Sequence, residues 1–503
     1  ANRRDKYTQI LWGIRDFEYR FGRQPEGMWL PETGVDLETL ALMAELGLRF
    51  TILSPFQARR YRKIGETQWQ ETAPGAIDTT RPYLVNLPGG RAIVVFFYNG
   101  EISSAVAFEN LLSNGERFAG RLLKELAGRS GPRLVHIATD GETYGHHHRH
   151  GDMALAFALH YIETSGLARL TNYGEYLEHH PPAYEAEINE HSAWSCAHGV
   201  ERWSGNCGCS TGMNPGWTQA WRAPLRRALN WLRDELAPLY EKQASLYLKD
   251  PWEARNDYIS VILDRSPESQ SEFLAKHALG KLGQAEQVKV LKLLEMQRHA
   301  MLMFTSCGWF FDEITGIETL QILKYAARVI QLAEETLGKK DLEPGFLKLL
   351  AEAKSNLPKY RDGAYVYEKY IKPARVDLSK VGAHYAICSL FEEYDEHHRI
   401  YCYDIEREDS HRRRAGVARL SLGQIRVTSR ITLESARLIY AVVNLGSHIV
   451  NGGVTNFQNE ECYRKIAEEI TAAFDRADFP GLVRLLDQRF GGSTYTLKEL
   501  FRD

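Results

Sequence analysis

The sequence predicts an α/β protein in which a parallel sheet is followed by a mainly α-helical region and a smaller β-containing part. Three observations support this class. Strand-like and helix-like segments alternate at short spacing over residues 27–53, as they do in a parallel-sheet unit. Continuous apolar runs at 92–98 and 134–138 are typical of strands buried on both faces. From about residue 215, long amphipathic stretches replace this alternation.

The totals are those of a soluble globular protein. The chain has 503 residues, of which 44% are hydrophobic and 25% are charged, and this length predicts about two to four domains. A formal net charge of −3 gives no electrostatic reason to expect a nucleic acid or a membrane as a partner. No apolar run approaches the length of a membrane-spanning helix, and the first residues lack the apolar core of a signal peptide.

The cysteine count and the chain ends add two expectations. Seven cysteines, an odd number without a regular framework, favour a reducing compartment, so we expect a cytoplasmic protein. The chain begins without Met and stops at Asp503 in a predicted helix that starts at Thr496. We therefore expect both ends to be cut from a longer polypeptide.

The amino-terminal elements follow from spacing and capping residues. Apolar residues at helical spacing predict a helix over 6–21, and a short strand over 27–30 leads to Glu32. Asp36 is the expected N-cap of a helix that runs to about Leu46, and a buried strand over 49–53 comes next. The chain continues with predicted strands at 92–98 and 134–138 and predicted helices at about 115–128 and 152–164.

The carboxyl-terminal part is predicted from the change in its hydrophobic pattern. Helices are predicted over 218–248, 251–263, 268–305 and 316–338, with further helical stretches to about 390. Strands at 416–422, 424–429 and 437–444 and helices from about 458 complete the chain. The resulting division is a catalytic α/β domain at 1–215, an α-helical domain at 216–390 and a β-containing domain at 391–503.

Two carboxylates, Glu32 and Asp140, each follow a predicted strand end. Function at the carboxyl ends of parallel strands is the rule in barrels and open α/β sheets, and a pair of carboxylates is what cleavage of a glycosidic bond needs. Trp29 and Tyr144 offer flat apolar surfaces on which a sugar ring can stack. The alternative for either carboxylate alone is a helix cap or an ion pair with arginine.

The segments around both carboxylates resemble a known family. Gly27-Met-Trp-Leu-Pro-Glu32 resembles the nucleophile motif of glycoside hydrolase family 57, and Asp140-Gly-Glu-Thr-Tyr-Gly145 resembles its acid/base motif. Ser192-Ala-Trp-Ser195 is similar to the family's tryptophan-containing fifth region. The resemblance covers about residues 1–240, and the rest resembles the long helical and β-containing region of a subgroup of uncharacterised relatives.

The resemblance implies a fold, a reaction and a set of site residues. It implies an incomplete (β/α)7 barrel that acts on α-glucans with retention, as in α-amylase-like, 4-α-glucanotransferase-like and branching-enzyme-like members, and that requires no cofactor. Glu32 is then the nucleophile and Asp140 the general acid/base. We expect the substrate to be bound by the following side chains: Trp29, Glu142, Tyr144, His146, His147, Trp194, Trp221 and Trp309.

One feature departs from the family pattern. The family opens with a His-Gln-Pro motif on its first barrel strand, and no such motif precedes Glu32 here. We therefore do not expect this chain to close the barrel alone. The aromatic segment that carries Trp309, residues 304–313, is interpreted either as a loop that reaches the site or as a kink in a helical core.

Two groups of residues invite a metal hypothesis. His146, His147, His148 and His150 are candidates for a divalent ion, as in metal-dependent deacetylases on related barrels. Three thiols and an imidazole lie within fourteen residues and match a Cys3His inventory for structural zinc; they are Cys196, His198, Cys207 and Cys209. The alternatives for these cysteines are reduced thiols packed in a loop or a disulfide.

Three functions remain open from the sequence. The first is a retaining hydrolase or transferase on α-glucan; which of the two depends on whether water or a sugar hydroxyl intercepts the intermediate. The second is a metal-dependent polysaccharide deacetylase. The third is a non-catalytic glucan-binding or assembly protein, which an expected missing amino-terminal segment favours. The sequence does not predict the oligomeric state.

Overall fold

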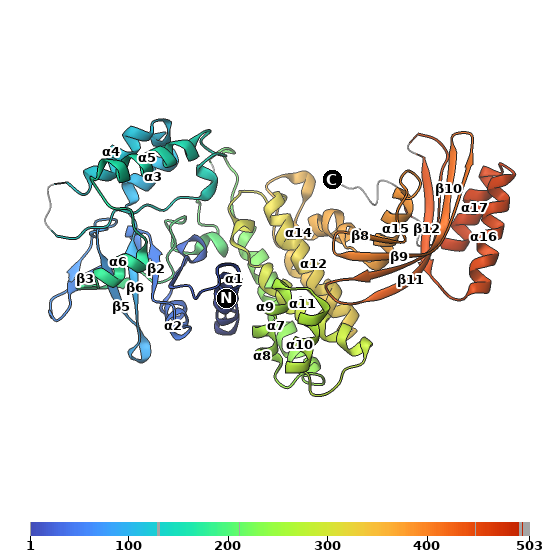
Figure 1. Ribbon diagram of the computed structural model, residues 1–503, viewed down its shortest axis with the longest axis horizontal. Helices are drawn as coiled ribbons and strands as arrows, with labels where there is room; N and C mark the ends of the chain where they lie inside the picture. The colour runs from blue at the N-terminus through green and yellow to red at the C-terminus, as the bar shows by residue number, and fades with distance from the viewer. Residues whose placement is uncertain (1, 128–130, 211, 448, 492–494, 496–503) are drawn as a thin grey trace. The chain divides into compact units, whose positions relative to one another are not determined.

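The computed structural model describes residues 2–127, 131–210, 212–447, 449–491 and 495 (Figure 1). The chain divides into two compact units, Ala1–Ala223 and Pro224–Asp503, and each is described by itself. The division into three domains at 215 and 390 stays a prediction. The helix expected from Thr496 onward lies outside the described residues.

The amino-terminal unit is built on a seven-stranded mixed sheet with the order β1-β2-β6-β5-β7-β3-β4. β1, β2 and β6 are parallel to one another, as the strand–helix–strand spacing predicts, and β5 and β7 form a second parallel pair. β5 runs antiparallel to β6, and β3 runs antiparallel to β7 and β4. The strands are β1 (Gly27–Met28), β2 (Phe50–Leu53), β3 (Ala58–Lys63), β4 (Gln70–Glu71), β5 (Pro82–Asn86), β6 (Ala92–Phe97) and β7 (Tyr184–Ile188).

Both faces of this sheet are covered, which explains the uninterrupted apolar run of β6. Ile93, Val95 and Phe97 pack in the core formed with α1 and α2, whereas Val94 and Phe96 pack on the opposite face with α6 and Leu134. Because successive strand residues point to opposite faces, burial on both sides requires every position to be apolar. The covering helices are α1 (Arg3–Phe21), α2 (Leu37–Glu45) and α6 (Tyr173–His179).

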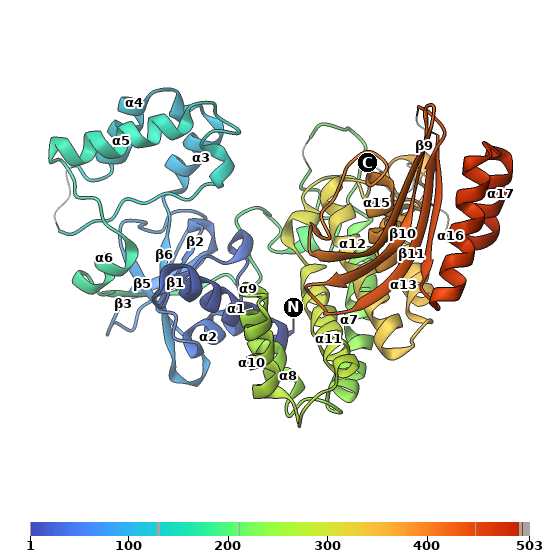
Figure 2. The same ribbon diagram turned by 45° about the vertical axis from the view of Figure 1, so that its right-hand side comes forward.

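Three further helices of this unit form a layer beyond the end of β6, with a hydrophobic core of their own (Figures 1 and 2). They are α3 (Gly100–Phe108), α4 (Gly115–Lys124) and α5 (Gly151–Ser165). Ile102, Phe118 and Ala158 are fully buried in that core. Only Tyr98 and Asn99 separate β6 from α3, so this layer stands at the carboxyl end of the parallel strands.

The predicted strand over 134–138 is wrong. The segment is extended but belongs to no ladder, because both edges of β6 are already taken, by β2 on one side and β5 on the other. It is held instead by single hydrogen bonds: the Leu134 N–H donates to Thr80 O (3.0 Å), and the Asn99 N–H donates to His136 O (2.9 Å). The segment therefore still ends near the carboxyl end of β6.

The second unit begins with a helical region, as the sequence predicts. The predicted helix over 268–305 is two helices, because residues 278–283, which include Gly280 and Gly283, interrupt it. The helices are α7 (Arg222–Ala244), α8 (Pro251–Asp257), α9 (Ile259–Leu263), α10 (Pro267–His277), α11 (Gln284–Leu302), α12 (Ile317–Leu337), α13 (Leu342–Leu350), α14 (Gly363–Val366) and α15 (Leu378–Cys388).

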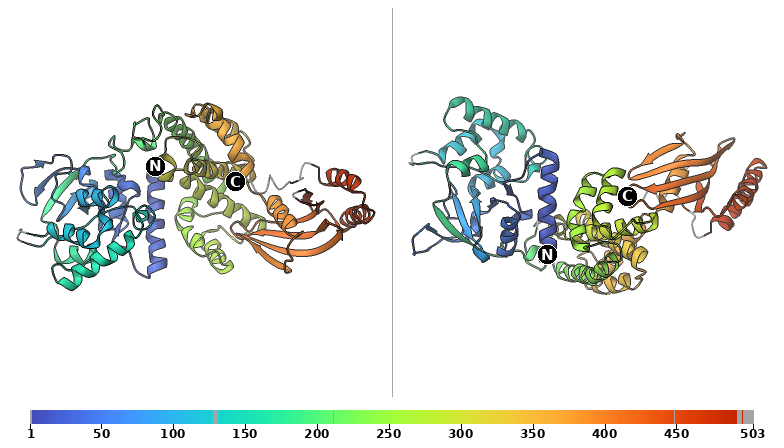
Figure 3. Two further views of the ribbon diagram at one scale, coloured as in Figure 1. Left: turned by 90° about the horizontal axis from the view of Figure 1, so that it is seen from above. Right: turned by 60° about the horizontal axis from the view of Figure 1, so that its bottom comes forward.

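A five-stranded antiparallel sheet follows, in the order β12-β11-β10-β9-β8. α15 packs on one face and the two last helices pack on the other (Figure 3). Leu438, Tyr440 and Val442 face α15, whereas the residues between them face the last two helices. The elements are β8 (His397–Ile400), β9 (Tyr403–Ala415), β10 (Ala418–Ser429), β11 (Ser435–Asn444), β12 (Val450–Asn456), α16 (Glu460–Asp475) and α17 (Phe479–Phe490).

The strands predicted at 416–422 and 424–429 are one continuous strand, β10. Gly423, which suggests a break in the sequence, lies inside the ladder. The position requires glycine because a Cβ there would lie 2.3 Å from the Asp409 carbonyl oxygen. The fold class is confirmed: an α/β unit with an unclosed sheet precedes a helical region and an antiparallel sheet. None of the described helices combines the length and apolar character that crossing a membrane requires.

Candidate active site

Glu32 lies in the short 3-10 turn Pro31–Thr33, just beyond β1. Both Glu32 and Thr33 have left-handed backbone conformations, with φ of 57° and 51°. Non-glycine residues seldom adopt this conformation, and such strain persists only where the surroundings hold it. The turn is therefore a strained segment, and this strain accompanies the orientation of the Glu32 carboxylate.

Trp194 fixes the Glu32 side chain. Its indole Nε1 donates a hydrogen bond of 2.6 Å to Glu32 Oε2. Its backbone N–H donates to the Glu32 carbonyl (3.1 Å) and to Thr33 Oγ1 (3.0 Å). Three bonds from one residue thus set both the backbone and the carboxylate of Glu32.

Aromatic rings surround this hydrogen bond. The Trp29 and Trp194 ring centroids are 4.9 Å apart, with the planes at 70°, and Tyr98 meets Trp194 edge-on at 6.0 Å. Trp29 remains 39% exposed, so it offers a ring surface to a ligand beside the half-buried carboxylate. Burial raises the pKa of Tyr98, although a hydrogen bond with Ser54 acts the other way.

Gln57 supports the strained turn from behind, and sequence reasoning missed it. Its Nε2 donates to Thr33 O (2.8 Å) and to Ser192 Oγ (3.0 Å), while its Oε1 accepts from the Ser54 N–H (2.9 Å). Ser54-Pro-Phe-Gln57 is a capping box at the end of β2, recognisable as serine followed three residues later by glutamine. Tyr98, at the end of the apolar run of β6, had no comparable signal.

Asp140 is placed through the extended segment before it. The Ala138 N–H donates to Ser103 Oγ in α3 (3.1 Å), and the Asp140 carbonyl accepts from the Thr143 N–H (3.1 Å). The Asp140 carboxylate is exposed. Both predicted catalytic residues therefore follow segments that end at the carboxyl side of the parallel strands, and their roles stay predictions.

The other predicted site residues near Asp140 are solvent-facing. Glu142, His146 and His147 are exposed, and Tyr144 is half-buried and accepts a hydrogen bond from Thr139 (3.2 Å). Over the described residues, no hydrogen bond, ion pair or ring contact joins these four to Glu32 or Trp194.

The histidines at 146–150 do not form a ligand cluster. His148 Nε2 lies 3.0 Å from the carbonyl oxygen of Ala107 in α3, which directs it away from its neighbours. Among the described residues, the group of side chains that could bind a metal ion together lies elsewhere, and it consists of Cys196, His198, Cys207 and Cys209.

Trp221 and Trp309 are enclosed in the protein interior. Trp221 is 1% exposed in the first unit and Trp309 is 0% exposed in the second, so neither ring presents a face to a ligand. Around Trp309, the Glu313 carboxylate accepts from Ser355 Oγ (2.6 Å) and from the Asn356 N–H (2.8 Å). This arrangement corresponds to the kink in a helical core that was the alternative for residues 304–313.

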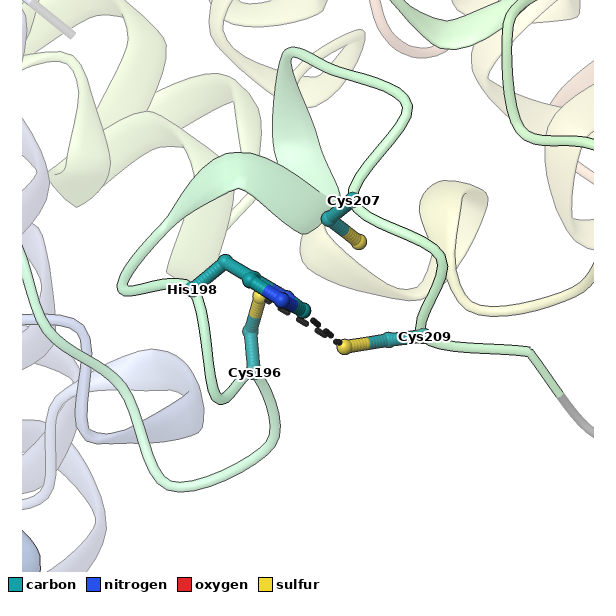
Figure 4. Close-up of side chains that lie close together, drawn as sticks. All are labelled: Cys196, His198, Cys207 and Cys209. Atoms are coloured by element: carbon teal, nitrogen blue, oxygen red, sulfur yellow. Dashed lines mark hydrogen bonds between the residues drawn. The ribbon is translucent and has the colours of Figure 1, made fainter.

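The cysteine–histidine group is compact. The possible ligand atoms of Cys196, His198, Cys207 and Cys209 all lie within 4.8 Å of one another (Figure 4). Cys196 Sγ is 3.9 Å from Cys209 Sγ, and Cys209 Sγ is 3.5 Å from His198 Nδ1. Cys196 follows Trp194 by two residues, so this group belongs to the same loop as the residue that holds Glu32.

The chain bears a weak structural likeness to several known proteins. A glycoside hydrolase family 57 branching enzyme from Thermococcus kodakaraensis is 16% identical over 75% of this chain and 68% of its own, with a TM-score of 0.41. The α-amylase AmyC from Thermotoga maritima is 13% identical over 72% of this chain and 69% of its own, also with a TM-score of 0.41. A 4-α-glucanotransferase from Thermococcus litoralis is 10% identical over 88% of this chain and 68% of its own, with a TM-score of 0.36. These scores are too low to bear on fold or function, and no curated protein matches the sequence.

Two family models match the chain directly. Residues 2–189 match glycosyl hydrolase family 57, and residues 217–501, more than half of the chain, match a domain of unknown function, DUF3536. The first match contains Glu32 and Asp140 and ends just before Trp194. The chain therefore belongs to the DUF3536 family, and its amino-terminal unit belongs to glycoside hydrolase family 57.

Proposed function

We propose that this protein is a retaining glycoside hydrolase or glucan transferase that acts on α-linked glucans through a covalent intermediate on Glu32. The family match of residues 2–189 supports the reaction class. The observation that carries the proposal is the Glu32 carboxylate, held at the carboxyl end of β1 by the 2.6 Å bond from Trp194 and flanked by the exposed ring of Trp29.

The first chemical step forms the intermediate. Glu32 attacks the anomeric carbon of the glucosyl unit with its carboxylate oxygen, the bond from that carbon to the glycosidic oxygen breaks, and Asp140 protonates the departing oxygen. The Trp194 hydrogen bond occupies Glu32 Oε2, which leaves Oε1 to form the new bond. Trp29 stacks against the sugar ring and sets its height above the carboxylate.

The second step releases the sugar. Asp140, now ionised, removes a proton from water or from a sugar hydroxyl, whose oxygen attacks the anomeric carbon while Glu32 leaves as a carboxylate. Two inversions give net retention. This chemistry needs the two carboxyl groups about 5–5.5 Å apart in the working complex, and it needs no metal ion at the reacting atoms.

Kinetics of paired variants test these roles. On a short α-1,4-glucan, Glu32→Gln and Asp140→Asn should each lower kcat by about 10²-fold or more, because each removes a group that acts in the transition state. The matched controls are Glu38→Gln and Asp152→Asn, which alter exposed carboxylates in the first turns of α2 and α5.

The stereochemistry of the product completes this test. Proton NMR of the initial product should show the α-anomer. The β-anomer, or wild-type rates in both site variants, would contradict the proposal. Glucan binding without turnover in the wild type would favour a non-catalytic binding protein instead.

We also propose a cytoplasmic location. The ground for it is the set of seven cysteines, none of which forms a disulfide in the structure. Thiols persist in a reducing compartment. Cell fractionation with an antibody to the protein checks this assignment.

A further inference from the structure

A compact group of possible metal ligands lies in the loop that carries Trp194. We propose that Cys196, His198, Cys207 and Cys209 bind one Zn²⁺ in a closed structural site, and that this ion fixes the position of Trp194. Figure 4 shows the four side chains pointing toward one another from two stretches of one loop. The inference concerns residues outside the chemical step and does not depend on the reaction proposed above.

The distances agree with tetrahedral zinc. With Zn–S of about 2.3 Å and Zn–N of about 2.0–2.1 Å, tetrahedral angles place two sulfurs about 3.8 Å apart and a sulfur and a nitrogen about 3.5 Å apart. Cys196 Sγ and Cys209 Sγ are 3.9 Å apart, and Cys209 Sγ and His198 Nδ1 are 3.5 Å apart. These two distances match the spacing around one tetrahedral ion, and all four ligand atoms lie within 4.8 Å of one another.

The backbone is shaped to bring the ligands together. Gly208, between Cys207 and Cys209, has a φ of 76°, which lets the chain turn so that both thiols point the same way. Gly199 follows His198 with a φ of 78°, and a Cβ there would lie 2.4 Å from the His191 carbonyl oxygen. The loop is therefore closed on itself around the ligands.

A buried cation matches the charge of the proposed centre. Three thiolates and one Zn²⁺ carry a net charge of −1. The Arg222 side chain is 0% exposed, and its Nη1 lies 3.6 Å from Cys207 Sγ as a hydrogen-bond donor. An anionic metal–thiolate centre attracts a guanidinium that is buried beside it.

The same geometry argues against the alternatives for these cysteines. A disulfide requires sulfurs about 2.05 Å apart and can join only two of the three thiols, whereas Cys196 and Cys209 are 3.9 Å apart with a third thiol and an imidazole beside them. Four protein ligands occupy all four coordination positions of a tetrahedral Zn²⁺, which leaves no position for water or substrate. The centre is therefore structural.

The centre is linked to the candidate active site by a few residues. Ala193 pairs with Cys196, and Ser192 pairs with Val35 next to the Glu32 turn. Trp194, which lies between Ala193 and Cys196 in the chain, makes the three hydrogen bonds to the Glu32 turn. Removal of the ion frees the loop on the carboxyl side of Trp194, and we expect Trp194 to lose its fixed position.

The first experiment measures metal in the full chain. Elemental analysis of protein purified under reducing conditions without added chelator should give one zinc per chain. Replacement by Co²⁺ should give the thiolate-to-cobalt charge-transfer band and the intense visible bands of a tetrahedral Cys3His site. Protein that holds no metal, and takes up neither ion after reduction, would overturn the proposal. Stoichiometric iron in place of zinc would overturn the assignment of the ion.

The second experiment connects the ion to the loop. Cys207→Ser should lower zinc content and speed amide hydrogen exchange in peptides that cover residues 190–209. The matched control Cys402→Ser, at a half-buried cysteine of the second unit, should change neither. Chelation of the wild type should reproduce the exchange pattern without any substitution. Unchanged exchange after proven loss of zinc would show that the ion does not hold Trp194, whatever the enzymatic activity.

Discussion

At the scale of single residues, the candidate site depends on a strained glutamate that its neighbours hold in place. Glu32 and Thr33 have positive φ angles, and Gln57 and Trp194 supply the hydrogen bonds that offset the strain. Thr33 is fully buried, and the Gln57 bond to its carbonyl is buried with it. The position of the Glu32 carboxylate therefore depends on three parts of the chain that are distant in sequence: the Glu32–Thr33 turn, Gln57 and Trp194.

Replacement of Gln57 by leucine tests this support. The variant leaves the buried Ser54 N–H and Thr33 carbonyl without partners, which should lower the free energy of unfolding by about 2–4 kcal/mol. It should also lower kcat, because the Glu32 turn loses a restraint. Urea unfolding and kinetics measure both, and Gln68→Leu at an exposed position should change stability by less than about 0.5 kcal/mol. Equal stability of the two variants would contradict the account.

His136 gives the amino-terminal unit a defined pH dependence. Burial lowers the pKa of His136 to about 4, from about 6.5 in the unfolded chain. Because the unfolded state binds a proton that the folded state excludes, stability is full above about pH 6.5 and falls as the pH drops toward 4, by about 3 kcal/mol in total.

Unfolding of His136→Gln between pH 4.5 and 7.5 checks this expectation. Glutamine can still bond to Tyr173 and Thr79, the partners of the two ring nitrogens, but it does not titrate. The variant should show a flatter pH profile than the wild type and than His179→Gln, which alters an exposed histidine. The same slope in all three proteins would rule out His136 as the source.

At the scale of elements, sequence patterns predict the helices and strands whose position depends on neighbouring residues alone. The helices around the first strands were found because Gly22 ends α1 and Asp36 caps α2, and β2 and β6 were found from their apolar runs. The segment 134–138 has the same apolar pattern but no free strand edge beside it. Competition for an edge is a property of the whole sheet, so a local pattern does not contain it.

The same limit applies to the candidate site and to the second sheet. The motifs point to Glu32 and Asp140, but only the topology brings Trp194 to Glu32 and Gln57 to the Thr33 carbonyl. The topology likewise brings Tyr98 to the ring of Trp194. β9 was not predicted because its charged residues lie half-exposed along the sheet and give no apolar run. Trp221 and Trp309 show the converse case, since an aromatic residue in a polar loop sequence can be part of the core.

The junction of α1 and α2 is an element-scale test. Asp36 accepts hydrogen bonds from the Thr39 N–H (2.7 Å) and from Lys6 Nζ (2.6 Å), so it caps α2 and ties it to α1. Asp36→Ala should cost about 1–2 kcal/mol of unfolding free energy, and Asp36→Asn, which keeps the cap, should cost less. Chemical denaturation measures the unfolding free energies of the two variants and so their order. Asp16→Ala in α1 is the control. An asparagine variant as unstable as the alanine variant would contradict the capping role.

At the scale of the whole molecule, the two compact units give the metal hypothesis a distinct signature. The proposed ligands all lie in Ala1–Ala223. A ligand that binds only the folded form of one unit stabilises that unit. Calorimetry should therefore show two transitions, of which chelation and Cys207→Ser lower the same one. A chelator that lowers both transitions or neither would contradict the assignment.

Trapping of the glycosyl-enzyme tests the central claim of the account most directly. The protein is incubated with an activated 5-fluoro α-glucosyl substrate, which slows breakdown of the intermediate, and its intact mass is measured before peptide mapping. The account predicts one fluoroglucosyl group on Glu32, absent in Glu32→Gln and present in Glu38→Gln. An adduct on another residue, or no adduct from protein that turns over α-glucan, would contradict the role of Glu32 as the nucleophile.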